Sequence, residues 1–112
     1  MSGADRLTSI GDNKHLCDSN LRKAWYRFKG SVGVKMPETV PPVDRCNTDA
    51  TGWLNGSHPS VFEGVVTRKV CFHWSGNPCK WSRIIRVLNC DHFYLYELLP
   101  TSNCHLRYCT QG

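Results

Sequence analysis

Seven cysteines in a chain of 112 residues are the side chains best able to do chemistry. At this density, cysteines form disulfides in an oxidising compartment, whereas in a reducing cytosol they bind metals or act in redox reactions. The tripeptide Asn55-Gly56-Ser57 is an acceptor for N-glycosylation, which occurs only on the secretory route. The sequence therefore predicts a disulfide-bonded extracellular glycoprotein, either secreted or held on the outer face of an anchored parent protein.

The odd number of cysteines leaves at least one sulfur without a partner in the chain if the others pair. Cys71 and Cys79 flank a dense turn signal at 75–78 that separates two strand-like runs. A bridge between such flanking positions has feasible geometry, so we expect these two cysteines to be bonded. Spacing alone does not place the remaining cysteines.

Zinc is the alternative use of these residues, because thiolate and imidazole are its usual ligands. Three histidines follow closely after a cysteine: Cys71/His73, Cys90/His92 and Cys104/His105. The chain contains no Cys-x2-Cys pair, however, and structural zinc sites usually contain one. We therefore predict no metal site and no cofactor.

No pattern of residues indicates catalysis. A disulfide-bonded sulfur is not a nucleophile, and no catalytic signature surrounds any of the cysteines. The acidic residues Glu38, Asp44, Asp49 and Glu63 stand in loop-like contexts without a partner pattern, which is typical of solvated charge. Glycine motifs that cradle phosphates are absent. The sequence predicts a protein that is not an enzyme and does not bind nucleic acid.

The basic balance of the chain suggests a second kind of function. A formal net charge of +5 would suit a polyanion such as heparin, although the lysines and arginines are dispersed along the chain, as on a solvated face. The alternative is thus a secreted lectin-like or polyanion-binding module. Its charge would come from Lys69, Lys80, Arg83 and Arg86.

Strands are the elements expected to position these residues. Runs rich in β-branched and aromatic residues occupy 64–74, 79–88 and 93–98, and the first two resemble a hairpin. A shorter run at 24–28 precedes two glycines, and the three prolines within 37–42 predict an irregular loop. No segment has the caps and periodicity of a long helix. We expect a small disulfide-rich, mainly β, loop-rich single domain.

Residues 1–15 are polar and lack periodicity, which predicts a flexible leader or linker before a domain at 16–112. Met1–Asp12 has no apolar run that could form the core of a signal peptide, and no stretch approaches the roughly 20 apolar residues of a membrane span. We expect the signal peptide and any anchor to belong to other parts of a larger parent protein, and this segment to make no membrane contact.

Five strings resemble the cysteine-rich domain, with eight or ten cysteines, of the family of uromodulin and the pancreatic zymogen-granule membrane glycoprotein. They are WYRF at 25–28, RCNT at 45–48, WLNGSHP at 53–59, HWSGN at 73–77 and YCT at 108–110. The resemblance runs from about Cys17 to Thr110. It implies a small extracellular β-rich module that is held by disulfides and usually lies upstream of a filament-forming zona pellucida module.

The resemblance also implies the cysteine pairing: Cys17 with Cys104, Cys46 with Cys109, and Cys71 with Cys79. Val40 and Pro78 stand where the family has a further bonded pair. Cys90 remains unpaired and resembles a family cysteine whose partner precedes the domain, so it is the expected attachment point of a covalent partner.

The family counterpart of Asn55 is glycosylated, and glycans of this domain serve in the family as decoys for mannose-binding bacterial adhesins. Trp53, two residues before the acceptor, is expected to be buried and to fix a rigid stem for the glycan. Together these residues imply a non-catalytic glycoprotein module that supports adhesion, assembly, or capture of ligands and microbes through a glycan-bearing loop.

Overall fold

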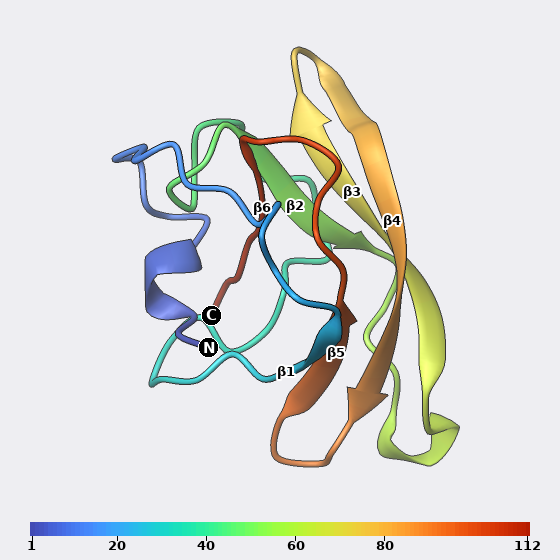
Figure 1. Ribbon diagram of the computed structural model, residues 1–112. Helices are drawn as coiled ribbons and strands as arrows, with labels where there is room; N and C mark the ends of the chain where they lie inside the picture. Colours follow the sequence, from blue (N-terminus) through green and yellow to red (C-terminus); the bar gives the residue numbers. More distant parts are fainter.

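The computed structural model describes residues 1–112, and its six strands form one curled sheet (Figure 1). The strands are β1 (Ala24–Tyr26), β2 (Ala50–Asn55), β3 (Val66–Trp74), β4 (Asn77–Asn89), β5 (Tyr94–Leu98) and β6 (Leu106–Tyr108), and two 3-10 helices are η1 (Ala4–Arg6) and η2 (Val61–Glu63). The order across the sheet is β1-β5-β4-β3-β2-β6, antiparallel except between β2 and β6. The predicted disulfide-rich, mainly β fold class is confirmed. Neither helix is long enough to span a bilayer.

The β3–β4 hairpin is the longest part of the sheet and projects beyond the other strands (Figure 1). Its two-residue loop, Ser75-Gly76, has both residues at positive φ, 51° and 77°, between the paired residues Trp74 and Asn77. Such loops match the right-handed twist of the flanking strands, and glycine adopts this conformation without steric cost. The hairpin predicted from the turn signal is therefore present.

Alternation along the strands separates an inner face from an outer one. On β4, Ile85 and Val87 are buried, whereas Ile84 and Arg86 between them are exposed. The inner face packs against Phe28 and Met36, which lie in the chain between β1 and β2. Twelve buried side chains form the core: Phe28, Met36, Ala50, Leu54, Val70, Phe72, Ile85, Val87, Tyr96, Leu98, Leu106 and Tyr108.

The N-terminal segment differs from the flexible leader predicted over residues 1–15. Ser2 forms a β-bridge with Lys29, just after edge strand β1, and Leu7 forms one with Thr110, just after the opposite edge strand β6. Residues 2–7 thus pair with the segments that follow the two edge strands of the sheet. Figure 1 shows η1 beside the C-terminal segment. The segment is an integral part of the domain.

A buried ion pair explains why this polar segment packs. The Arg6 guanidinium donates to both carboxylate oxygens of Asp18, at 2.7 and 2.9 Å, and to the Tyr108 carbonyl at 3.0 Å. Arg107 in turn donates to the Asp5 carboxylate at 3.0 Å. Polar side chains are buried when they find such partners. The hydrophobic pattern carries no trace of this pairing, and the segment therefore resembled a linker.

Candidate functional site

Three disulfides cross-link the chain: Cys17–Cys104, Cys46–Cys109 and Cys71–Cys79. These are the pairs that the family resemblance implied. Two of them close long loops, with sequence separations of 87 and 63, whereas the third closes the β3–β4 hairpin with a separation of 8. The two long closures restrict the unfolded chain most.

Asn55 ends strand β2, and the whole tripeptide Asn55-Gly56-Ser57 is exposed. The sequence did not predict this strand. Its residue Gly52 allows close packing, since a Cβ there would lie 2.8 Å from the Arg107 carbonyl oxygen and from the Phe72 ring. Pairing with β3 extends to Asn55, and pairing with β6 at residues 50–52 holds the start of the same strand, so the backbone that carries the acceptor residue is fixed.

The Asn55 amide nitrogen, where a glycan would be attached, is free of strong contacts. Its one hydrogen-bond partner is the Cys71 sulfur at 3.7 Å, and sulfur is a weak acceptor. In the sheet register Asn55 pairs with Lys69, which pairs with Ile84 on β4, so these three side chains form a row on the outer face. Ile84 is 60% exposed and lies open to a glycan rooted at Asn55.

Trp53 lies under the hairpin tip on the same face as Asn55. The side chain is buried, as expected, but it stands outside the main core and opposite Cys71 in the register. Its Nε1 donates to the Pro78 carbonyl at 2.9 Å. The Cys71–Cys79 disulfide holds the same tip, so the indole and the disulfide tie strand β2 to the hairpin at Trp53, two residues before the acceptor.

His58, just after the acceptor tripeptide, is the centre of a polar chain that the sequence did not reveal. Its Nδ1 is hydrogen-bonded to the Glu38 carboxylate, and its Nε2 lies 2.6 Å from the Tyr96 hydroxyl, which accepts the Met36 N–H at 3.0 Å. In neutral His58, Nδ1–H donates to Glu38 and Nε2 accepts from Tyr96. These partners are 20 and 38 residues away, so no local pattern points to them.

Burial lowers the pKa of His58, although the neighbouring Glu38 carboxylate opposes this effect. The hydrogen bonds from His58 hold the pKa of Glu38 below its ordinary value. Glu38 was interpreted as solvated loop charge, and the structure instead makes it a partner that ties the proline-rich loop to the acceptor loop. Glu63 also differs from that interpretation, because it forms a capping box with Ser60 at η2.

The proline-rich loop at 37–42 is also hydrogen-bonded to the sheet, next to Val40, which is one of the two positions where the family has a further disulfide. His73 Nδ1–H donates to the Pro41 carbonyl at 2.7 Å, one residue after Val40. Thr51 Oγ1 donates to the Pro42 carbonyl at 3.0 Å. Hydrogen bonds therefore hold this loop.

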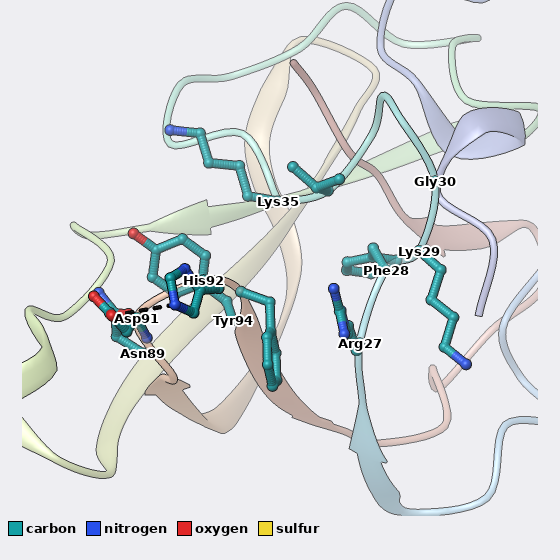
Figure 2. Close-up of a pocket in the computed structure, with 11 residues that line it drawn as sticks. Arg27, Phe28, Lys29, Gly30, Lys35, Asn89, Asp91, His92 and Tyr94 are labelled. Carbon is teal, nitrogen blue, oxygen red and sulfur yellow. Dashed lines mark hydrogen bonds and ion pairs between the residues drawn. The ribbon is translucent and has the colours of Figure 1, made fainter.

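Cys90 has no disulfide partner and is half-buried in the turn between β4 and β5, where its N–H donates to the Phe93 carbonyl at 2.8 Å. The adjoining residues of this turn line a pocket of about 500 Å³ (Figure 2). Three basic residues line the same pocket, Arg27, Lys29 and Lys35, and the Arg27 guanidinium lies 4.1 Å from the centre of the Phe93 ring.

The basic residues singled out in the sequence do not form one patch. Arg83 alternates to the face opposite that of Lys69 and Arg86. Arg86 is already engaged, since it donates two hydrogen bonds to Glu97, at 2.8 and 2.6 Å. The Lys80 ammonium lies 5.6 Å from the Trp81 ring centre, at the hairpin end. The pocket brings together three other basic residues, Arg27, Lys29 and Lys35, beside the acidic Asp91.

The neighbouring cysteines and histidines considered as zinc ligands do not come together as thiolate sites. The sulfurs of Cys71 and Cys104 belong to disulfides, and His73 is bonded to a carbonyl oxygen. His105 instead faces Asp49, which was interpreted as solvated charge but is hydrogen-bonded to two histidines and to Asn13.

Comparison with known proteins adds a family match. The family model of the uromodulin-like domain matches residues 26–110. Pancreatic secretory granule membrane major glycoprotein GP2 of Canis lupus familiaris is 48% identical over 108 residues, which cover 96% of this chain and 21% of that protein. Uromodulin of Mus musculus is 54% identical over 95 residues, which cover 84% of this chain and 15% of that protein. The chain thus spans about a fifth or less of these relatives.

Proposed function

This chain belongs to the uromodulin-like domain family, and we propose that it is a non-catalytic module of a larger extracellular glycoprotein that captures microbial adhesins through an N-glycan on Asn55. The observation that carries the proposal is an exposed acceptor tripeptide at the end of strand β2, which pairs with β3 as far as Asn55 and with β6 at residues 50–52. A glycan on such a base leaves the domain in a defined direction.

The surroundings of Asn55 support this role. Glycosylation at the amide nitrogen gives up only the weak contact with the Cys71 sulfur. The first sugars can lie over Ile84, which otherwise exposes apolar surface. The core of every N-glycan contains mannose, so the ligand class that fits is a mannose-binding bacterial adhesin, as the family resemblance implies.

Binding of a purified mannose-specific adhesin to the immobilised domain tests the proposal. The domain is secreted from mammalian cells in which glycan processing stops at oligomannose. Asn55→Gln and Ser57→Ala each destroy the acceptor through a different residue, and both should abolish binding. Asn103→Gln changes an exposed asparagine outside any acceptor sequence and should bind like the parent domain. Undiminished binding by Asn55→Gln and Ser57→Ala would overturn the proposal.

A lectin-like or polyanion-binding function is the second candidate, and the basic pocket favours it. Figure 2 shows Arg27 beside Lys29 on one side of this pocket and Lys35 on another side, with the two lysine side chains extending outward. Retention on heparin that falls with salt, and falls further in Lys29→Gln and Lys35→Gln, would support this candidate. If Lys29→Gln and Lys35→Gln are retained on heparin as strongly as Lys69→Gln, the pocket is excluded as the heparin-binding site.

We also propose that Cys90 bonds to a cysteine outside this chain, in the parent protein or in another molecule. Its position in the β4–β5 turn supports this, since the flanking Asp91 and His92 are exposed and Cys90 itself is only half-buried. A thiol of this kind readily forms mixed disulfides in an oxidising compartment.

A further inference from the structure

Two histidines and an aspartate meet at a place remote in sequence from the acceptor loop. His15 Nδ1 lies 3.0 Å from one carboxylate oxygen of Asp49, and His105 Nδ1 lies 2.7 Å from the other. The three prospective ligand atoms all lie within 4.8 Å of one another. We propose that His15, Asp49 and His105 form a zinc-binding site of this domain.

The donor set and its geometry suit zinc. Imidazole nitrogen and carboxylate oxygen bind Zn²⁺ at about 2.0–2.2 Å, which places neighbouring donors of a tetrahedral shell about 3.3 Å apart. Each imidazole nitrogen lies near a different oxygen of Asp49, at 3.0 Å for His15 and 2.7 Å for His105, so both rings must shift outward to complete a zinc shell. The rings can make this adjustment, because the side chains of His15 and His105 are 62% and 43% exposed.

The charge of the site also favours a cation. His15 and His105 are the only basic side chains within ion-pair distance of Asp49, and neither carries the permanent charge of an arginine. The Asn13 side-chain amide donates to the Asp49 carboxylate and holds its orientation, as residues behind a metal ligand commonly do. The carboxylate therefore lacks a fixed counter-ion that zinc would have to displace.

The backbone holds the three ligands in place before any metal arrives. The Cys17–Cys104 disulfide joins the two histidine-bearing segments, since His15 is two residues from Cys17 and His105 directly follows Cys104. The His105 carbonyl accepts the Ala50 N–H at 3.1 Å, which ties His105 to the residue after Asp49. A site organised in this way loses little conformational entropy on binding.

Three protein ligands leave one position of a tetrahedral zinc ion open. A cavity of about 180 Å³ adjoins the site, and Asp49 and His105 line it together with Trp74 and Trp81. A water molecule, or a carboxylate or imidazole from a partner, has room to occupy that position. The sequence pointed to pairs of cysteine and histidine instead, and predicted no metal, because these ligands stand at positions 15, 49 and 105 and no spacing rule connects them.

Calorimetric titration of the chelator-treated domain with zinc chloride at neutral pH tests the site. We expect one ion per chain, and His15→Gln and His105→Gln should each weaken binding about tenfold or more, since each removes one of three protein ligands. His92→Gln alters an exposed histidine outside the site and should bind as the parent does. Cys90→Ser should also bind unchanged, which excludes the free thiol as the ligand.

Nuclear magnetic resonance of the histidine rings provides a second readout on the unmutated protein. Zinc should shift the ring signals of His15 and His105 together and leave those of His92 in place. The absence of saturable binding, or binding that both His15→Gln and His105→Gln retain in full, would overturn the proposal. If His105→Gln fails to fold, the exposed His15→Gln variant and the ring shifts decide the matter.

Discussion

Replacement of Arg6 by alanine should release the N-terminal segment from the domain and lower the free energy of unfolding of the whole domain. The Arg6 side chain is 6% exposed, and its ion-pair partner Asp18 is 3% exposed. Without the guanidinium, the Asp18 carboxylate keeps the Tyr108 N–H at 2.8 Å, and its nearest remaining cation is Arg107, whose Nε is 4.0 Å away. A buried carboxylate is then left with too few partners.

The expected cost follows from this geometry. Removal of one partner from a buried ion pair typically costs about 3–5 kcal/mol, because the other charge remains buried. Arg107 offsets a part of that, so we expect the lower end, about 3 kcal/mol, for Arg6→Ala. With a urea dependence of about 1–3 kcal/mol per molar, the unfolding midpoint should fall by about 1–3 M.

Urea unfolding followed by the fluorescence of the four tryptophans, with the disulfides intact, measures this change. Arg22→Ala is the matched control, because Arg22 is exposed and its side chain has no hydrogen-bond partner. Deletion of residues 1–10 should cost at least as much as Arg6→Ala. A loss below about 1 kcal/mol for Arg6→Ala, as for an exposed ion pair, would refute the buried anchor.

The remaining predictions concern the cysteines and the response to acid. Alkylation of the unreduced protein followed by peptide mapping should label Cys90, and label found mainly on Cys46 or Cys104 would contradict the observed pairing. In urea unfolding, replacing both Cys71 and Cys79 with alanine should cost about 2.5 kcal/mol, whereas replacing both Cys17 and Cys104 should cost about 4.6 kcal/mol. The difference arises because the entropy of loop closure grows with the sequence separation, which is 8 for the first pair and 87 for the second. Equal losses of stability would argue against this entropic origin. Burial lowers the pKa of His58, so on acidification this histidine is protonated first in the unfolded chain. The stability of the domain should therefore fall as the pH drops below the ordinary histidine pKa of 6.5. It should fall further below pH 4.5, because the lowered pKa of Glu38 makes protonation of this carboxylate favour the unfolded chain. Thermal melting across this range should show the first fall in the parent domain and not in His58→Gln.

Local signals explain which strands the sequence revealed. The β3–β4 hairpin has a turn sequence and long β-branched runs, and its partners are adjacent in the chain, so pattern alone identified it. Strands β2 and β6 have no such signal. They pair in parallel across more than fifty residues, and β6 is only three residues long, so burial by the rest of the fold defines them.

The same distinction holds for the functional residues. Asn55 is visible in a tripeptide, and Cys71 with Cys79 is visible in a hairpin, because each signal is local. The other two disulfides came only with the family resemblance. The pairs His58 with Glu38 and His15 with Asp49 join loops across 20 and 34 residues, and polar loop residues show no periodicity that would predict such contacts.

Occupancy of Asn55 is the most direct measure of a glycan-presenting module. The domain, secreted from mammalian cells, is digested without reduction, and the peptide that contains residues 55–57 is analysed intact by mass spectrometry. We predict that most of this peptide carries a mannose-containing glycan on Asn55, in material whose three disulfides are formed. Unmodified Asn55 in correctly bonded, secreted protein would contradict the account.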